Sequence, residues 1–145
     1  MPTAKDILAI KGSRVATIHP EATVYEAALR MNEERIGSLV VLDQNQLVGL
    51  FTERDILQRV VAEQRDAAHT PVHEVMTTEV LCCQLHTTLE EARGVMKNRR
   101  IRHLPVLGDD DELLGMISIG DLNAYQTSTQ EQTIYFLEQY IHGQV

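Results

Sequence analysis

The stretch GLFTERD at residues 49–55 returns as GMISIGD at residues 115–121, and this repetition decides the fold. Each copy has a glycine, two apolar residues, a threonine or serine, two further residues and an aspartate. Upstream, TVYEA at 23–27 matches TLEEA at 88–92 with an offset of 88 − 23 = 65, whereas the first pair is offset by 115 − 49 = 66. One extra residue in the polar turn GDDD at 108–111 accounts for the difference. The chain is therefore an internal duplication.

Each copy predicts the same order of elements, βαββα. The first helix of each copy opens with a capping box, formed by Thr23 with Glu26 or by Thr88 with Glu91. Apolar residues then recur on one helical face, and a polar turn joins the next two strands as a hairpin. The expected strands are residues 15–18, 38–42 and 47–51 in the first copy and 80–83, 103–107 and 113–117 in the second. The last helix of each copy is expected to begin near Arg54 or Gly120. In the first copy this helix has an apolar face of Ile56, Leu57, Val60 and Val61.

This pattern predicts an α/β (α+β) protein of two βαββα repeats. A single repeat covers only one face of its three-stranded sheet. We therefore expect the two repeats to pack sheet to sheet, with pseudo-twofold symmetry and a cleft at the seam. The first repeat, with an N-terminal helix capped by Thr3, is expected to span residues 1–70, and the second, with a C-terminal helix over about 128–142, residues 71–145. An apolar stripe on that last helix packs on its own domain or against a second chain.

The amino-acid composition argues against some classes of function. The chain has 145 residues, of which 43% are hydrophobic and 23% charged, and a formal net charge of −8. An acidic chain repels a nucleic-acid backbone, so we expect no nucleic-acid partner. No apolar run has the roughly 20 residues that span a bilayer, and no signal-peptide pattern is present. Adjacent Cys82 and Cys83 make a poor disulfide pair. We therefore expect a cytoplasmic protein without a membrane partner.

The repeated Thr/Ser-x-x-Asp segment is the first candidate site. At a strand-to-helix junction, the hydroxyl of Thr52 or Ser118 and the nearby amides can hold a phosphate. The carboxylate of Asp55 or Asp121 can accept hydrogen bonds from the vicinal hydroxyls of a ribose. The same residues also suit a plain helix cap, in which the hydroxyl is the N-cap and the aspartate lies in the first turn. Their repetition does not exclude capping.

The second candidate is Arg102-His103 at the start of a strand. At the equivalent place in the first copy stand Gly37-Ser38, two of the smallest residues. Capping does not explain this difference. The second copy would supply positive charge and the first copy space, a combination that suits a flat anionic ligand. Solvated residues at a strand edge would give the same pattern.

With these motifs in view, the chain resembles a tandem pair of CBS domains, a Bateman module, from about residue 4 to 125. The resemblance rests on the two Gly-apolar-apolar-Thr/Ser-x-x-Asp segments, the strand Arg-His-Leu-Pro-Val at 102–106 and the duplication, and it is strongest to short stand-alone bacterial proteins. It implies an adenine nucleotide (AMP, ATP or NAD) between the repeats, no catalytic cofactor, a homodimer and a regulated protein that the sequence does not identify. The implied ligand-binding residues are Thr17, Gly37, Ser38, Thr52, Arg54, Asp55, Leu81, Cys82, Arg102, His103, Pro105, Ser118, Gly120 and Asp121.

In this interpretation the aspartates hold ribose, and Ser118, Thr52, Arg102 and His103 hold phosphate. Adenine lies against the first strand of a repeat, and Arg54 reaches a second phosphate. The better site is expected around Ser118 and Asp121, since the first copy lacks the Arg-His pair.

Other functions were weighed against this one. A metal site of Cys82, Cys83, His86 and His103 is disfavoured, because adjacent cysteines close a tetrahedron poorly and a buried thiol explains them. The sequence offers no nucleophile-base pair and no pair of tuned carboxylates, so no catalytic residues are predicted and the chain is not expected to be an enzyme. The alternatives that stay open are an assembly protein without a physiological nucleotide and, less favoured, a nucleotide hydrolase.

Overall fold

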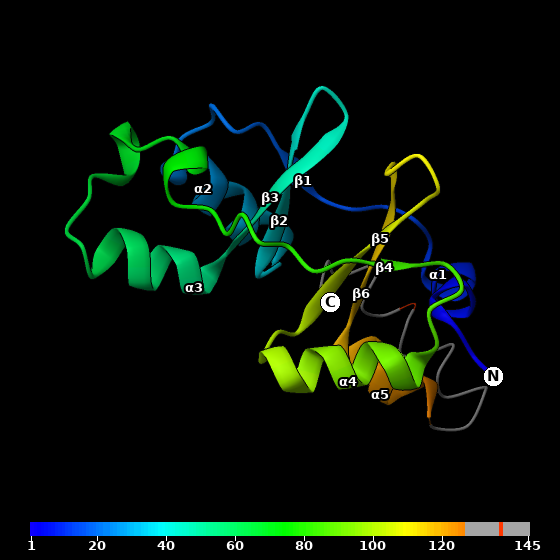
Figure 1. Ribbon diagram of the computed structural model, residues 1–145. Coiled ribbons are helices and arrows are strands. Elements are labelled where there is room, and N and C mark those ends of the chain that lie inside the picture. The colour runs from blue at the N-terminus through cyan, green and yellow to red at the C-terminus, as the bar shows by residue number, and fades with distance from the viewer. Residues whose placement is uncertain (127–136, 138–145) are drawn as a thin grey trace. The chain divides into compact units, whose positions relative to one another are not determined.

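The computed structural model in Figure 1 describes residues 1–126 and residue 137. The chain forms two compact units. Unit 1 combines Met1–Arg14 with the chain from Leu81 onward, and unit 2 is the continuous stretch Val15–Val80. Each unit contains one three-stranded sheet with its own helices. The predicted mixed α+β class and the duplicated architecture are confirmed.

Unit 2 is built on the sheet β1-β2-β3. β1 runs parallel to β2, so the chain has to cross over between them, and α2 makes this connection. β2 and β3 form the predicted antiparallel hairpin. The elements are β1 (Thr17–Ile18), α2 (Val24–Glu34), β2 (Ser38–Asp43), β3 (Gln46–Thr52), α3 (Glu53–Asp55), η1 (Ile56–Val61), η2 (Ala67–His69) and η3 (Val72–Glu74). Their apolar faces enclose a core of Val24, Ala27, Met31, Leu39, Val41, Phe51, Val60, Val72 and Val75.

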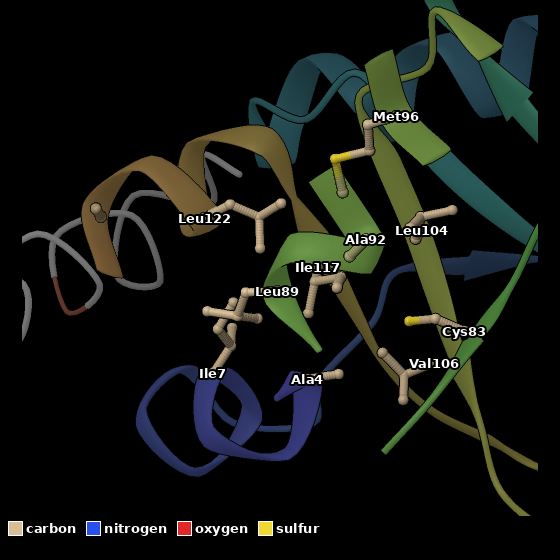
Figure 2. Close-up of a cluster of buried hydrophobic side chains, with 11 residues drawn as sticks. Ala4, Ile7, Cys83, Leu89, Ala92, Met96, Leu104, Val106, Ile117 and Leu122 are labelled. Carbon is tan, nitrogen blue, oxygen red and sulfur yellow. The ribbon is translucent and has the colours of Figure 1, made fainter. Parts of the chain in front are cut away.

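Unit 1 repeats this topology with the sheet β4-β5-β6. Its elements are α1 (Ala4–Lys11), β4 (Cys83–Gln84), α4 (Leu89–Arg99), β5 (His103–Leu107), β6 (Leu113–Ser118) and α5 (Ile119–Tyr125). Figure 2 shows that its core joins side chains of α1, α4, α5 and the sheet. Helices α2 and α4 end alike, with Arg35 and Arg100 in the left-handed conformation at φ 55° and 54°. The duplication therefore extends to the backbone.

The N-terminal helix α1 precedes the first repeat in the sequence but packs in unit 1 with the second repeat. Ala4 N donates to Thr87 O at 2.9 Å and Lys5 N donates to Leu85 O at 3.0 Å. Ala4 and Ile7 are fully buried in the core of unit 1. The physical reason is that α1 fills an apolar surface of unit 1 that α4 and α5 leave uncovered.

An equivalent segment covers unit 2. The stretch after η3 pairs with β3, since Thr77 N donates to Leu50 O at 2.9 Å and Leu50 N donates back to Thr77 O at 2.9 Å. Each covering segment presses a long side chain onto a glycine. A Cβ on Gly115 would lie 2.7 Å from Leu8 Cδ2, and one on Gly49 would lie 2.4 Å from Met76 Sδ. The glycine of the repeated motif therefore lies under a long side chain in both copies, and a larger residue there would displace that side chain.

Some expected features differ in the structure. The first strand of each repeat is shorter and begins further along than predicted. In the expected apolar face after Asp55, Val60 is buried, but Leu57 and Val61 are 63% and 62% exposed. Ile56 and Val60 face the core of unit 2, whereas Leu57 and Val61 each lie one position further around the π-helix Ile56–Val61 and face outward. The predicted C-terminal helix lies outside the described residues.

No helix among residues 1–126 is long and apolar enough to cross a membrane.

Candidate functional site

In unit 1 the repeated motif forms a buried helix cap where β6 meets α5. Asp121 N donates to Ser118 Oγ at 3.1 Å, and Ser118 N donates to Asp121 Oδ2 at 2.9 Å. Both residues are 1% exposed. The capping interpretation of this motif is confirmed, and the binding of phosphate and ribose by the same residues stays a prediction.

A residue that the sequence did not single out reaches this aspartate. Lys11, at the end of α1, places Nζ 2.8 Å from Asp121 Oδ2 and 3.0 Å from Met116 O. The Lys11 side chain is only 9% exposed. Burial lowers the pKa of Lys11, and the neighbouring Asp121 opposes that shift. Asp121 Oδ1 is also buried, and it has no hydrogen-bond partner among the residues that the structure describes.

In unit 2 the motif forms the equivalent cap where β3 meets α3. Thr52 N donates to Asp55 Oδ2 at 3.0 Å, and Asp55 N donates to Thr52 Oγ1 at 3.3 Å. Asp55 is 4% exposed. Here the covering segment supplies a neutral group, since Thr77 Oγ1 donates to Asp55 Oδ1 at 3.0 Å. The nearby cation is Arg59, whose half-exposed guanidinium lies 3.7 Å from Asp55 Oδ1.

The Arg102-His103 pair lies next to the cap of unit 1. His103 pairs with Ser118 across the β5-β6 hairpin, and Arg102 O accepts a hydrogen bond from Ile119 N at 2.9 Å. Burial lowers the pKa of His103 to about 4, and the charges of Lys11 and Arg102 add to that effect. His103 is therefore neutral at pH 7, so the exposed Arg102 is the member of the pair that carries charge.

The structure divides the predicted site residues between the units. Ser38 pairs with Thr52 across the hairpin of unit 2, and Gly37 O accepts a hydrogen bond from Glu53 N at 3.1 Å. In unit 1, Pro105 is buried within β5, and Cys83, beside Cys82, is a buried thiol whose pKa is raised to about 12. Unit 2 holds Thr17, Gly37, Ser38, Thr52, Arg54 and Asp55; unit 1 holds Leu81, Cys82, Arg102, His103, Pro105, Ser118, Gly120 and Asp121.

The sequence analysis missed Lys11 and Thr77. Lys11 is 110 positions from Asp121, and nothing in the spacing of the motif indicates which segment covers it. A signal was available within the repeat, because each residue comes from the segment that precedes the first strand of a copy.

The comparisons with known proteins agree with this architecture. A family model described as the CBS domain matches residues 4–62 and 72–127. The CBS domain-containing protein YhcV of Bacillus subtilis is 38% identical over 130 residues, which are 90% of this chain and 89% of that protein.

Solved structures of similar chains share the fold. A protein with CBS domains from Burkholderia ambifaria superposes with a TM-score of 0.81 at 37% identity, covering 88% of this chain and 98% of that one. A hexameric CBS-CP12 protein from bloom-forming cyanobacteria gives a TM-score of 0.71 at 29% identity, covering 85% and 70%. With two matched domains and a duplicated fold, the chain belongs to the CBS-domain family, as a tandem pair of CBS domains.

Proposed function

We propose that this CBS-domain pair binds an adenine nucleotide and regulates another protein in response. The observation that carries the proposal is the buried Oδ1 of Asp121, which has no hydrogen-bond partner within the described part of the chain. A buried acceptor without a donor is costly, and a ribose hydroxyl would supply the missing hydrogen bond. Asp55 forms the same helix cap in unit 2, except that its Oδ1 already accepts a hydrogen bond from Thr77 Oγ1.

The remaining groups have complementary roles in this proposal. In unit 1 the exposed guanidinium of Arg102 binds phosphate by charge-assisted hydrogen bonds, and neutral His103 donates a ring N–H. Adenine lies along Leu81-Cys82. In unit 2 the exposed Arg54 binds a phosphate, and the base lies near Gly37, where the exposed side chain of Glu53 has to move aside.

The role of the protein is regulatory, not catalytic. Proteins with CBS domains are generally regulatory. A bound nucleotide can signal only if it binds one conformation more tightly than another, so the expected output is a change in conformation or in affinity for a partner. In this proposal the CBS-domain pair acts on the regulated protein by binding to it.

Calorimetry with AMP, ATP and NAD tests nucleotide binding. We expect Asp121→Asn and Asp55→Asn each to weaken binding at their own site about tenfold or more, since a hydrogen bond to a charged group contributes about 1.5–3 kcal/mol. Asparagine keeps an oxygen for the helix cap, and because Asp121→Asn also leaves the buried ammonium group of Lys11 without its anion, circular dichroism checks that this variant folds. Asp109→Asn, in the exposed turn of unit 1, is the matched control and should leave binding unchanged.

The same measurements separate the alternatives. No heat and no thermal stabilisation by any adenine ligand would favour an assembly protein without a nucleotide. Conversion of ATP or NAD to products on long incubation would indicate a hydrolase.

We further propose that the protein forms a homodimer through the helices of unit 2. Tyr25 and Leu29 on α2 are 53% and 44% exposed, and Leu57 and Val61 on η1 are exposed still further. Exposed apolar side chains of this size are the kind that a second copy of the chain would cover. The hexameric relative is an assembly of CBS-domain chains.

Sedimentation velocity tests the dimer. We expect Leu57→Glu to shift the protein to monomer, because a buried unpaired carboxylate at an interface costs several kcal/mol. Gln58→Glu adds the same charge at the next position, which is also exposed, and serves as the control. A monomeric wild type, or a dimer that Leu57→Glu leaves intact, would contradict the proposal.

A further inference from the structure

The two buried aspartates are covered by equivalent segments that differ in charge. In unit 1 the segment places Leu8 on Gly115 and the ammonium group of Lys11 on Asp121. In unit 2 it places Met76 on Gly49 and the hydroxyl of Thr77 on Asp55. The segment that covers the aspartate therefore contributes a cation in unit 1 and a neutral donor in unit 2.

The contact of Lys11 leaves Asp121 with little capacity for a ligand. Oδ2 already accepts from Lys11 Nζ and from Ser118 N, so Oδ1 is the oxygen without a partner among the described residues. A carboxylate that grips the two hydroxyls of a ribose uses both oxygens. A diol at Asp121 must therefore take the place of Lys11 on Oδ2.

Displacing Lys11 has a consequence for the kind of ligand. Its ammonium group lies almost wholly within the protein, and a buried cation separated from its partner is strongly unfavourable unless another anion replaces that partner. A phosphate on the incoming ligand is such an anion. Thr77 carries no charge, so a ribose that replaces its hydroxyl at Asp55 leaves no buried cation behind.

We propose that Lys11 is an internal competitor for Asp121 that makes the site of unit 1 selective for phosphorylated nucleosides, whereas the site of unit 2 accepts the ribose with or without phosphate. This inference rests on the proposed nucleotide-binding function and adds the residue that sets its selectivity. It narrows the expectation of a better site around Ser118 and Asp121 to ligands that carry a phosphate.

The experiment compares adenosine with AMP by calorimetry in an Asp55→Asn background, which removes the ribose carboxylate of unit 2. In that background we expect AMP to bind at least tenfold more tightly than adenosine. Lys11→Met should tighten adenosine and reduce the ratio of AMP to adenosine affinity about tenfold. Lys5→Met removes a charge from the exposed face of the same helix and should leave the ratio unchanged.

A second variant covers the case in which Lys11→Met does not fold. Lys11→Gln removes the charge but keeps a hydrogen-bond donor for Asp121, and we expect an intermediate reduction of the ratio. A purely structural Lys11 would weaken both ligands equally, so an unchanged ratio in the folded variants overturns the inference while nucleotide binding stands. No binding of either ligand to the wild type or to any variant overturns the proposed function and this inference with it.

Discussion

Replacing Lys11 by methionine is expected to lower the free energy of unfolding by about 3–5 kcal/mol at pH 7, because it leaves the carboxylate of Asp121 buried without its cation. Lys11 and Asp121 are 9% and 1% exposed, so water does not replace the lost contact. Methionine keeps the length and apolar character of the lysine stem, which separates the loss of charge from a loss of packing. Urea unfolding at equilibrium measures the effect.

A double-mutant cycle completes this test. Lys11→Met combined with Asp121→Asn removes both charges, and we expect it to recover most of the stability, since replacing a buried ion pair by neutral groups is often close to neutral. Lys5→Met on the exposed side of α1 should change stability by less than about 0.5 kcal/mol. A loss below about 1 kcal/mol for Lys11→Met would contradict a stabilising role for the pair.

Acidification is expected to destabilise the protein through His103. Its pKa is lowered to about 4 in the folded chain, whereas the unfolded chain has the ordinary value of 6.5. Between these values the unfolded chain binds a proton that the folded chain does not, so the stability present above pH 6.5 is lost as the pH falls toward 4. With about 1.4 kcal/mol for each pKa unit, the full loss is roughly 3 kcal/mol.

The contribution of His103 is measured as a difference between variants. Unfolding is followed at several pH values for the wild type and for His103→Gln, which keeps a polar side chain but does not titrate. The wild type should lose more stability on acidification than the variant. His86→Gln, at an exposed position of the same unit, should follow the wild type. Parallel curves for the wild type and His103→Gln would contradict the assignment.

The local elements could be predicted because their signals lie close together in the chain. The hairpins follow from alternating strands around a polar turn, and Thr88 with Glu91 forms the full capping box. At Thr23 the threonine half is present, since its hydroxyl accepts from Glu26 N. Because the chain is duplicated, each of these local patterns occurs twice. The order βαββα could therefore be predicted without knowledge of the packing.

Contacts between distant segments could not be predicted in this way. The match of Lys11 to Asp121, or of Thr77 to Asp55, depends on which segment covers which sheet, and no local pattern encodes that choice. The protonation state of His103 could not be predicted from the sequence either, because the burial of the side chain in the folded unit sets its pKa. The motif revealed where the candidate sites lie but not what occupies their carboxylates.

The assignment of α1 to unit 1 has a consequence for the order in which the protein forms during synthesis. Unit 2 is one continuous stretch, Val15–Val80, so all of its partners have been made once that stretch leaves the ribosome. Unit 1 joins the first residues of the chain to a sheet that ends at Ser118. Because domains generally fold as units and loops of high sequence separation close slowly, α1 must wait unpaired until the second repeat is complete. Helix α1 is therefore translated before unit 2 but packs only after the second repeat has been made.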